Sequence, residues 1–273
     1  MATNIDTPLT GAAVALTERR GNGLGAADLV AAAIPVLLTA ALFVTYRASP
    51  SFYLEYVLQG SMREHQAVEL ITFACCFVGT LLLLVATRRL WRSDTVPRSG
   101  KLLQRRGAVL IVAVVALATF FFAGEEISWG QSYLQWTTPE AVREVTPETN
   151  LHNIHGLPIS VNSLGSVFLI IVFVALPIAW RWRESLGLPG SWRPAIAEWP
   201  IVFAILFAFV VKLYKSIYRA TVADAESQTF YVGYVEQINE QKEMLVAVAL
   251  LMYAVYRVRA TRSDALRDRS GTP

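Results

Sequence analysis

The chain has 273 residues, of which 54% are hydrophobic and 16% are charged, and its mean hydropathy is +0.43. A soluble domain of average composition carries about 25% charged residues, so the composition excludes an ordinary soluble globule. The 12 prolines, 16 glycines and two cysteines are too few for a collagen-like chain, a low-complexity disordered chain or a disulfide framework. Because the apolar residues gather in blocks, we expect an integral membrane protein.

Six of these blocks approach the roughly 20 apolar residues that a membrane-spanning helix needs. The sequence therefore predicts an all-α membrane protein, a bundle of about six transmembrane helices. One transmembrane domain is expected over residues 28–259, between an N-terminal segment (1–27) and a C-terminal tail (260–273), with long loops at 125–160 and 214–240. The predicted spans lie near residues 28–46, 67–87, 107–124, 161–180, 197–213 and 241–257.

The distribution of charge predicts the orientation of the bundle. Seventeen of the 24 Lys and Arg residues lie in the N-terminal segment, in the loops after the second and fourth spans, and between Arg257 and the C-terminus. Because Lys and Arg are enriched on the cytoplasmic side of membrane proteins, both termini are predicted to be cytoplasmic. Thirteen of the 21 Asp and Glu residues lie on the other, outer side. The net charge of +3 thus reflects topology, and we expect no nucleic-acid partner.

Ionisable side chains also gather at the outer ends of the predicted spans. His65 and Glu69 are four residues apart, so on a helix they would share a face. This spacing suits two ligands of one metal or a carboxylate that orients an imidazole, although an interfacial histidine with a hydrogen-bonded glutamate explains it too. Glu69 lies about one turn inside its apolar block, where ionisable groups are costly and usually face an interior cavity.

Two adjacent carboxylates, Glu125 and Glu126, end the third predicted span. Negative charge at the C-terminal end of a helix opposes the helix dipole, so a positive group should offset it. The candidates are a metal ion, Arg63, Lys212 and Lys215. Because like charges so close together cannot both ionise easily, one carboxyl group could keep its proton and act as a general acid. A solvent-exposed acidic helix end is the alternative.

Two further clusters lie in the outer loops. His152 and His155 have neither zinc-finger nor zincin spacing, but in an extended segment both imidazoles could converge on one centre. Glu236, Glu240 and Glu243 follow i, i+4, i+7 spacing just before the last span, which places them on one face of a helix. That face could supply carboxylates to a shared site, or it could be a solvated face before the helix enters the membrane.

Several of these residues belong to a recognisable pattern. The run Gly124–Gln131 (GEEISWGQ), the Thr-Pro-Glu that ends at Glu140, the run Asn150–Asn153 (NLHN) and the Arg63-Glu64 pair resemble a family of bacterial multi-pass membrane proteins. Members of that family have no assigned activity, so the resemblance implies no catalytic role. It implies a polytopic fold in the bacterial inner membrane, with a shared Glu and His signature at the periplasmic face.

Together these features favour a metal-dependent hydrolase or transferase that acts on a lipid or lipid-linked substrate at the periplasmic membrane surface, with Zn, Mg, Mn or Fe as the metal. The alternative is a non-enzymatic scaffold, or an accessory subunit of an envelope complex, in which the same residues form a structural network. The expected partners are membrane lipids, and a lipid-linked substrate or an envelope protein. The candidate catalytic residues are Glu69, Glu125, Glu126 and His152; the candidate metal ligands are His65, His152, His155, Glu126, Glu236 and Glu240; the candidate substrate-binding residues are Arg63, Trp129, Gln131, Asn153, Lys212 and Lys215.

Overall fold

In the computed structural model, every regular element of the described residues is a helix. The described residues are 25–58, 67–92, 102–134, 137, 140, 161–221, 230–235 and 237–270. Within them the predicted all-α fold is confirmed, and six helices are long and apolar enough to cross a membrane.

The six long helices overlap the six predicted spans, and each ends beyond its predicted span, the last two by the most. The fifth reaches Thr221 and the sixth reaches Ser270, beyond the predicted ends at residues 213 and 257. The fourth is a continuous run of short helical elements from Val161 to Trp182. The long elements are α2 (Ala26–Ala48), α4 (Ala67–Arg92), α5 (Leu102–Glu126), α8 (Val161–Ile170) with η5 (Ile171–Ala175), α9 (Leu176–Ala179) and η6 (Trp180–Trp182), α10 (Trp199–Thr221) and α12 (Ile238–Ser270).

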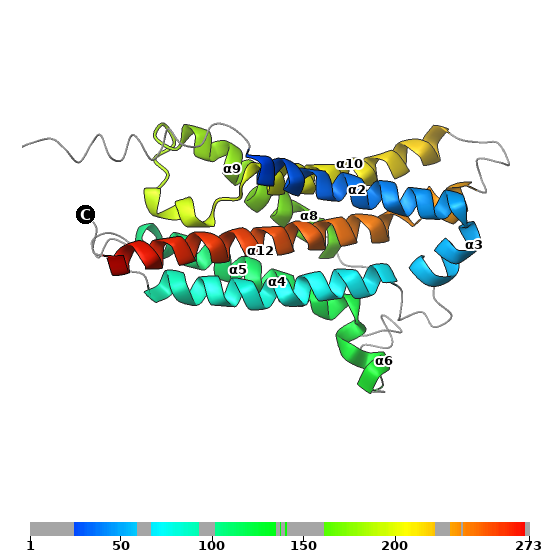
Figure 1. Cartoon of the computed structure of the whole chain (residues 1–273), viewed down its shortest axis with the longest axis horizontal. Helices are drawn as coiled ribbons and strands as arrows, with labels where there is room; N and C mark the ends of the chain where they lie inside the picture. The colour runs from blue at the N-terminus through cyan, green and yellow to red at the C-terminus, as the bar shows by residue number, and fades with distance from the viewer. Residues whose placement is uncertain are drawn as a thin grey trace, which may run out of the picture.

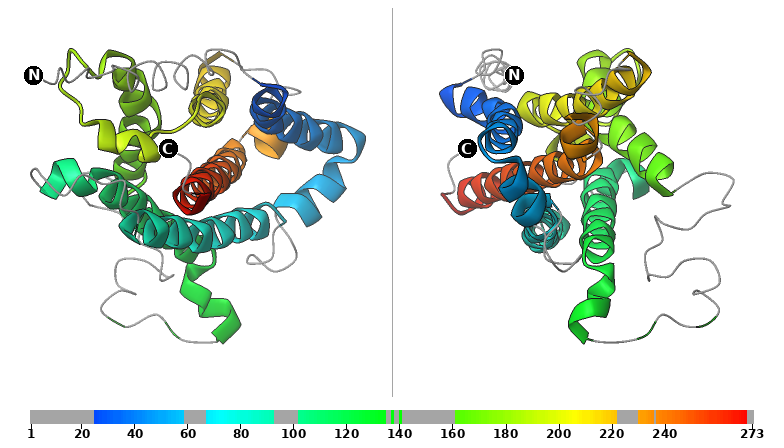
Figure 2. Two further views of the ribbon diagram at one scale, coloured as in Figure 1. Left: turned by 60° about the vertical axis from the view of Figure 1, so that its left-hand side comes forward. Right: turned by 90° about the vertical axis from the view of Figure 1, so that its right-hand side faces the viewer.

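Helix α12 runs through the middle of the bundle and packs against α4, α10 and α2 (Figures 1 and 2). It belongs to the most buried of the six candidate spans. In the span Gly233–Arg262, 67% of the most hydrophobic stretch is buried, against 6% of the corresponding stretch in α2. Alanines 247, 249 and 254 are buried on α12, and small side chains let neighbouring helices approach closely. The bundle is therefore built around α12, and α2 is a peripheral helix.

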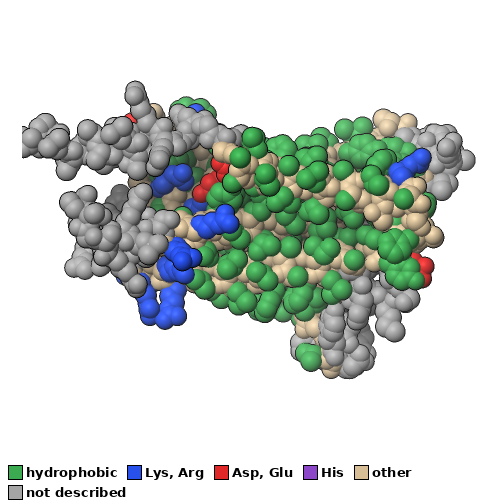
Figure 3. Space-filling view, in the orientation of Figure 1, with side chains coloured by type: hydrophobic (Ala, Val, Ile, Leu, Met, Phe, Trp, Pro, Cys, Tyr) green, Lys and Arg blue, Asp and Glu red, His purple; other side chains and the backbone are tan. Residues whose placement is uncertain are grey.

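Arginine-rich helix ends meet at one end of the bundle, here called the basic end. Arg89 Nη1 donates to the carbonyl oxygen of Val258 at 3.2 Å, which joins the end of α4 to α12. The Arg106 guanidinium lies 3.6 Å from the centre of the Trp91 ring, which joins the start of α5 to the end of α4. Figure 3 shows most of the visible Lys and Arg side chains at this end, beside a broad apolar belt.

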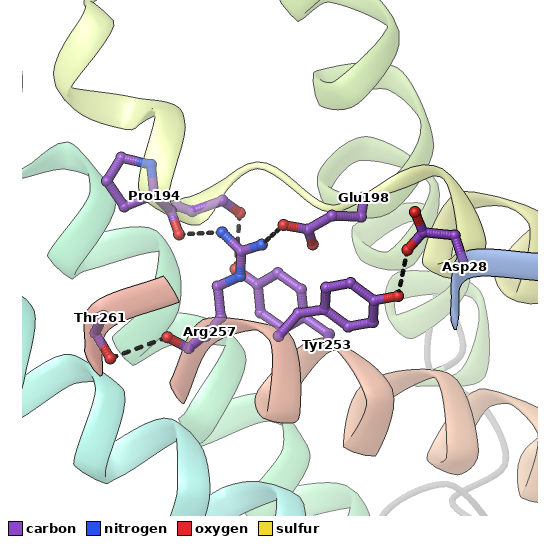
Figure 4. A network of polar contacts seen from close by, with 8 residues as sticks. Asp28, Pro194, Glu198, Tyr253, Arg257 and Thr261 are labelled. Carbon is purple, nitrogen blue, oxygen red and sulfur yellow. Dashed lines mark hydrogen bonds and ion pairs between the residues drawn. The ribbon is translucent and has the colours of Figure 1, made fainter. Parts of the chain in front are cut away.

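A buried ion pair ties α12 to the segment that leads into α10 (Figure 4). Arg257 is 1% exposed, pairs with the Glu198 carboxylate, and donates to the Pro194 carbonyl oxygen at the end of η7 (Gly190–Ala195). One turn earlier, the Tyr253 hydroxyl donates to the Ala195 carbonyl oxygen at 2.7 Å. The Tyr256 hydroxyl donates to Asp28 at 2.7 Å, so the start of α2 joins the same network.

We predict that Arg257→Met lowers the free energy of unfolding in detergent by about 3 kcal/mol, because it leaves Glu198 half-buried without its cation. The control is Arg183→Met, since the Arg183–Glu184 pair is long, at 3.9 Å, and its glutamate side chain is 90% exposed. Loss of that surface pair should cost less than about 1 kcal/mol. Equal stability of the two variants in thermal or denaturant unfolding would contradict a structural role for the buried pair.

Candidate functional site

The end of the bundle opposite the basic end carries the predicted site residues that the structure describes. Glu69 lies in the first turn of α4, Glu125 and Glu126 end α5, and Glu240 lies in the first turn of α12. Trp129 lies in η3 (Ser128–Gly130), Gln131 begins α6 (Gln131–Leu134), and Lys212 and Lys215 lie in the second half of α10. Six predicted residues lie outside the described residues: Arg63, His65, His152, Asn153, His155 and Glu236.

The chain kinks immediately after α5 (Figure 2). Ser128, Trp129 and Gly130 have φ angles of 47°, 55° and 79°, so all three are left-handed. Such angles are strained for residues other than glycine, and strain of this kind persists only where the surroundings enforce it. Here the kinked backbone directs the Trp129 ring back onto α5, edge-on to Phe120 and Phe121 with ring centres 5.9 and 5.4 Å away.

The folded-back indole holds one of the two carboxylates. Trp129 Nε1 donates to Glu125 Oε1 at 2.7 Å, and Glu125 is only 8% exposed. The approach needs a glycine at position 124, because a Cβ there would lie 2.8 Å from the Trp129 ring. Gly124, Glu125 and Trp129 thus form one interlocked unit, which accounts physically for much of the GEEISWGQ run.

The neighbouring carboxylate, Glu126, faces charges from two other helices. Glu69 from α4 and Glu240 and Glu243 from α12 act on it electrostatically. Together with Glu125 these five acids are called the carboxylate cluster below. The structure therefore brings together Glu69, Glu125, Glu126 and Glu240 of the predicted site.

The described cation that acts on Glu126 is Lys242. Its Nζ lies 3.2 Å from Glu243 Oε1, and the two side chains are 12% and 20% exposed. Lys212 and Lys215, which the sequence offered as the balancing cations, are not among the residues that act on Glu126. Lys242 was not among the predicted site residues. Its position next to Glu243, at the start of the last predicted span, could have indicated a cation at this place.

A cavity of about 380 Å³, called the groove below, lies between α5, α8 and α12 beside the cluster. This volume is within the range of small-molecule sites. Its walls include Phe121, Phe122, Phe168, Leu169, Val246 and Leu250, and its polar rim includes Glu125, Glu126, Asn162, Lys242 and Glu243.

Sequence reasoning did not predict this groove. The sequence feature that could have indicated a groove is the run of polar and small residues at the start of the fourth span. In the structure, a Cβ added to Gly165 in this run would meet no atom within 4 Å. The hydroxyl groups of Thr119 and Ser166 on the groove walls donate to carbonyl oxygens of their own helices, at 2.7 and 2.8 Å.

A buried glutamine sets the rotation of α12 at this end. Gln241 is 1% exposed; its Nε2 donates to the Tyr53 hydroxyl at 2.8 Å, and the Tyr234 hydroxyl donates to its Oε1 at 3.4 Å. Burial raises the pKa of Tyr53 above its ordinary value, so this hydroxyl stays protonated. With Gln241 turned toward Tyr53, the positions that follow it on α12, Lys242 and Glu243, line the groove.

A metal centre depends on residues that the structure does not describe. Among the described residues, no group of three or more His, Cys, Asp or Glu side chains is placed to hold a metal ion. Of the predicted metal ligands only Glu126 and Glu240 are described, so the three histidines and Glu236 would have to complete any centre. Comparisons with protein-family models, curated proteins and solved structures found no match to this chain.

We predict that Gly124→Ala lowers the free energy of unfolding by about 1–3 kcal/mol, because the added methyl group pushes Trp129 off α5. Gly165→Ala is the matched control: it is also a helical glycine, but its Cβ would meet open space, so stability should be unchanged or higher by less than about 1 kcal/mol. Thermal unfolding in detergent measures both. If Gly124→Ala were as stable as the control, Trp129 would not be held by this packing.

Proposed function

We propose that the chain is an integral membrane protein of the bacterial inner membrane, with its basic end in the cytoplasm and its carboxylate cluster at the periplasmic surface. Six helices long and apolar enough to span a membrane support this placement. So does the collection of arginines at one end, because basic residues accumulate on the cytoplasmic side. Both termini would then be cytoplasmic.

The orientation predicts the reactivity of single cysteines toward a membrane-impermeant maleimide. In a chain whose Cys75 and Cys76 are replaced by alanine, a cysteine at Glu55 should react in intact cells, and one at Arg181 only after the membrane is opened. Both positions are exposed and lie at opposite ends of the bundle. Labelling of Arg181→Cys from outside would reverse the proposed orientation.

We further propose that the protein acts on a lipid or a lipid-linked substrate, as a hydrolase or transferase. The observation that carries this proposal is the groove, whose apolar walls lead to the carboxylates of Glu125 and Glu126. A hydrocarbon chain suits such walls, and it would bring the polar part of the substrate to the cluster. There Glu126 would exchange a proton with the reacting group, while Glu125 is oriented by Trp129.

The same proposal includes a divalent metal, held by Glu126 and Glu240 together with His65, His152, His155 and Glu236. When bound, such an ion would polarise an acyl or phosphoryl oxygen or activate a water molecule. Arg63, Gln131, Asn153, Lys212 and Lys215 remain candidate substrate-binding residues.

A second candidate function is that of a scaffold or accessory subunit. The specific observations that favour it are the Trp129–Glu125 hydrogen bond and the Lys242–Glu243 ion pair, each of which ties side chains together within the cluster. In this case the carboxylates would stabilise the fold.

The test is lipid turnover by the purified protein in vesicles of total bacterial lipid, supplied with divalent metals and followed by mass spectrometry. We expect one lipid class to decrease and its product to appear with the wild type, and turnover to fall at least tenfold in Glu126→Gln. Elemental analysis of the same samples reports the metal. No change in any lipid class with the wild type would contradict the enzyme proposal.

The stability of Glu126→Gln separates the two candidate functions. If the cluster serves catalysis, removing one of several neighbouring negative charges should raise the free energy of unfolding by about 1 kcal/mol. If the cluster is structural, the same change should lower it. Glu55→Gln, an exposed carboxylate at the same end of the bundle, is the control and should leave stability unchanged.

A further inference from the structure

The length and position of the groove indicate how an amphiphile would lie in it. On α5 the lining runs from Ala118 to Glu126, positions eight residues apart or about 12 Å along the helix. On α12 it runs from Leu250 to Lys242, which is a similar length. Half of the hydrocarbon core of a bilayer is about 15 Å thick, so the groove spans much of one leaflet. A chain lying along it would place its head group at the carboxylate cluster.

We propose that the occupant of this groove is an amphiphile with one hydrocarbon chain along the apolar walls and a positively charged amine or ammonium head group against Glu126 and Glu243. This inference rests on the proposed function and deepens it, because it names the charge of the substrate's head group.

Charge complementarity carries the inference. Among the described residues three acids and one lysine act on Glu126, so acidic groups outnumber basic groups around it. The C-terminal end of α5 adds partial negative charge of the helix dipole at the same place. Lys242 lies against Glu243, so its charge is already opposed. Without a bound metal ion, a cationic head group is attracted by this end of the groove and an anionic phosphate is repelled.

The remaining lining is suited to the chain. The Thr119 and Ser166 hydroxyls already donate hydrogen bonds to carbonyl oxygens of their own helices. The middle of the groove therefore does not need a polar ligand to satisfy these two donors. At Gly165 a larger side chain would extend into open space, and Gly165 lines the groove. Gly165→Leu should therefore fill part of the volume that the chain would occupy, without displacing another side chain.

The test compares dodecyltrimethylammonium with dodecyl phosphate, which share one chain and differ in head-group charge. The full-length protein is purified in dodecyl maltoside with EDTA, so that no divalent metal occupies the carboxylates, and binding is measured by equilibrium dialysis with labelled amphiphiles. We expect the ammonium compound to bind at least about tenfold more tightly than the phosphate. In Glu126→Gln and Glu243→Gln this preference should decrease, and in Gly165→Leu binding of the ammonium compound should fall about tenfold.

Glu55→Gln is the control for a nonspecific loss of negative charge, and unfolding midpoints confirm that each variant is folded. If the phosphate binds as tightly as the ammonium compound, or if the preference survives both glutamine substitutions, the inference on head-group charge is wrong while the lipid-acting proposal stands. If neither amphiphile binds and Gly165→Leu has no effect, the groove is not a lipid site and the proposed function falls with it.

Discussion

Two buried polar side chains hold helix α12 in place, and the site depends on both. Gln241 bonds to Tyr53 and Tyr234 near one end, and Arg257 bonds to Glu198 and Pro194 near the other. They are 16 residues, or about 24 Å, apart along the helix, which approaches the thickness of a bilayer's hydrocarbon core. In an apolar bundle, hydrophobic contacts alone only weakly prevent a helix from sliding along its neighbours or rotating about its axis. Such hydrogen bonds therefore specify how far the helix is inserted and which of its faces each neighbour contacts. They determine that Lys242 and Glu243 lie beside the end of α5.

The carboxylate cluster follows from that placement. Helices α4, α5 and α12 carry acids at this end and arginines at the other, so these three helices are electrically divided along their length. Bringing like charges together in a half-buried place costs stability, and a fold under no functional demand has no reason to accept that cost. The strained turn at Ser128 and Trp129 is a second feature that costs stability. It brings the indole N–H of Trp129 to Glu125. The occupant proposed for the groove beside the cluster would account for both features.

Much of this architecture could be predicted from the sequence, because hydropathy and charge report directly on membrane spans and their ends. The six helices and the convergence of Glu69, Glu126 and Glu240 are examples. The role of Gly124 could not be predicted, because it depends on the left-handed turn that returns Trp129 to α5. The candidates for the balancing positive group were a metal ion, Arg63, Lys212 and Lys215; Arg63 lies outside the described residues, and Lys242, which was not a candidate, acts on Glu126. The groove arises from three helices far apart in sequence, and no single segment encodes it.

The most direct measurement is an experimental structure of the full-length protein crystallised from a lipidic mesophase that contains bacterial lipid. The account predicts elongated density along α5, α8 and α12, ending at Glu126 and Glu243 in a head group or an ion. A groove closed by repacked side chains, with Glu126 and Glu243 directed into bulk solvent, would contradict it.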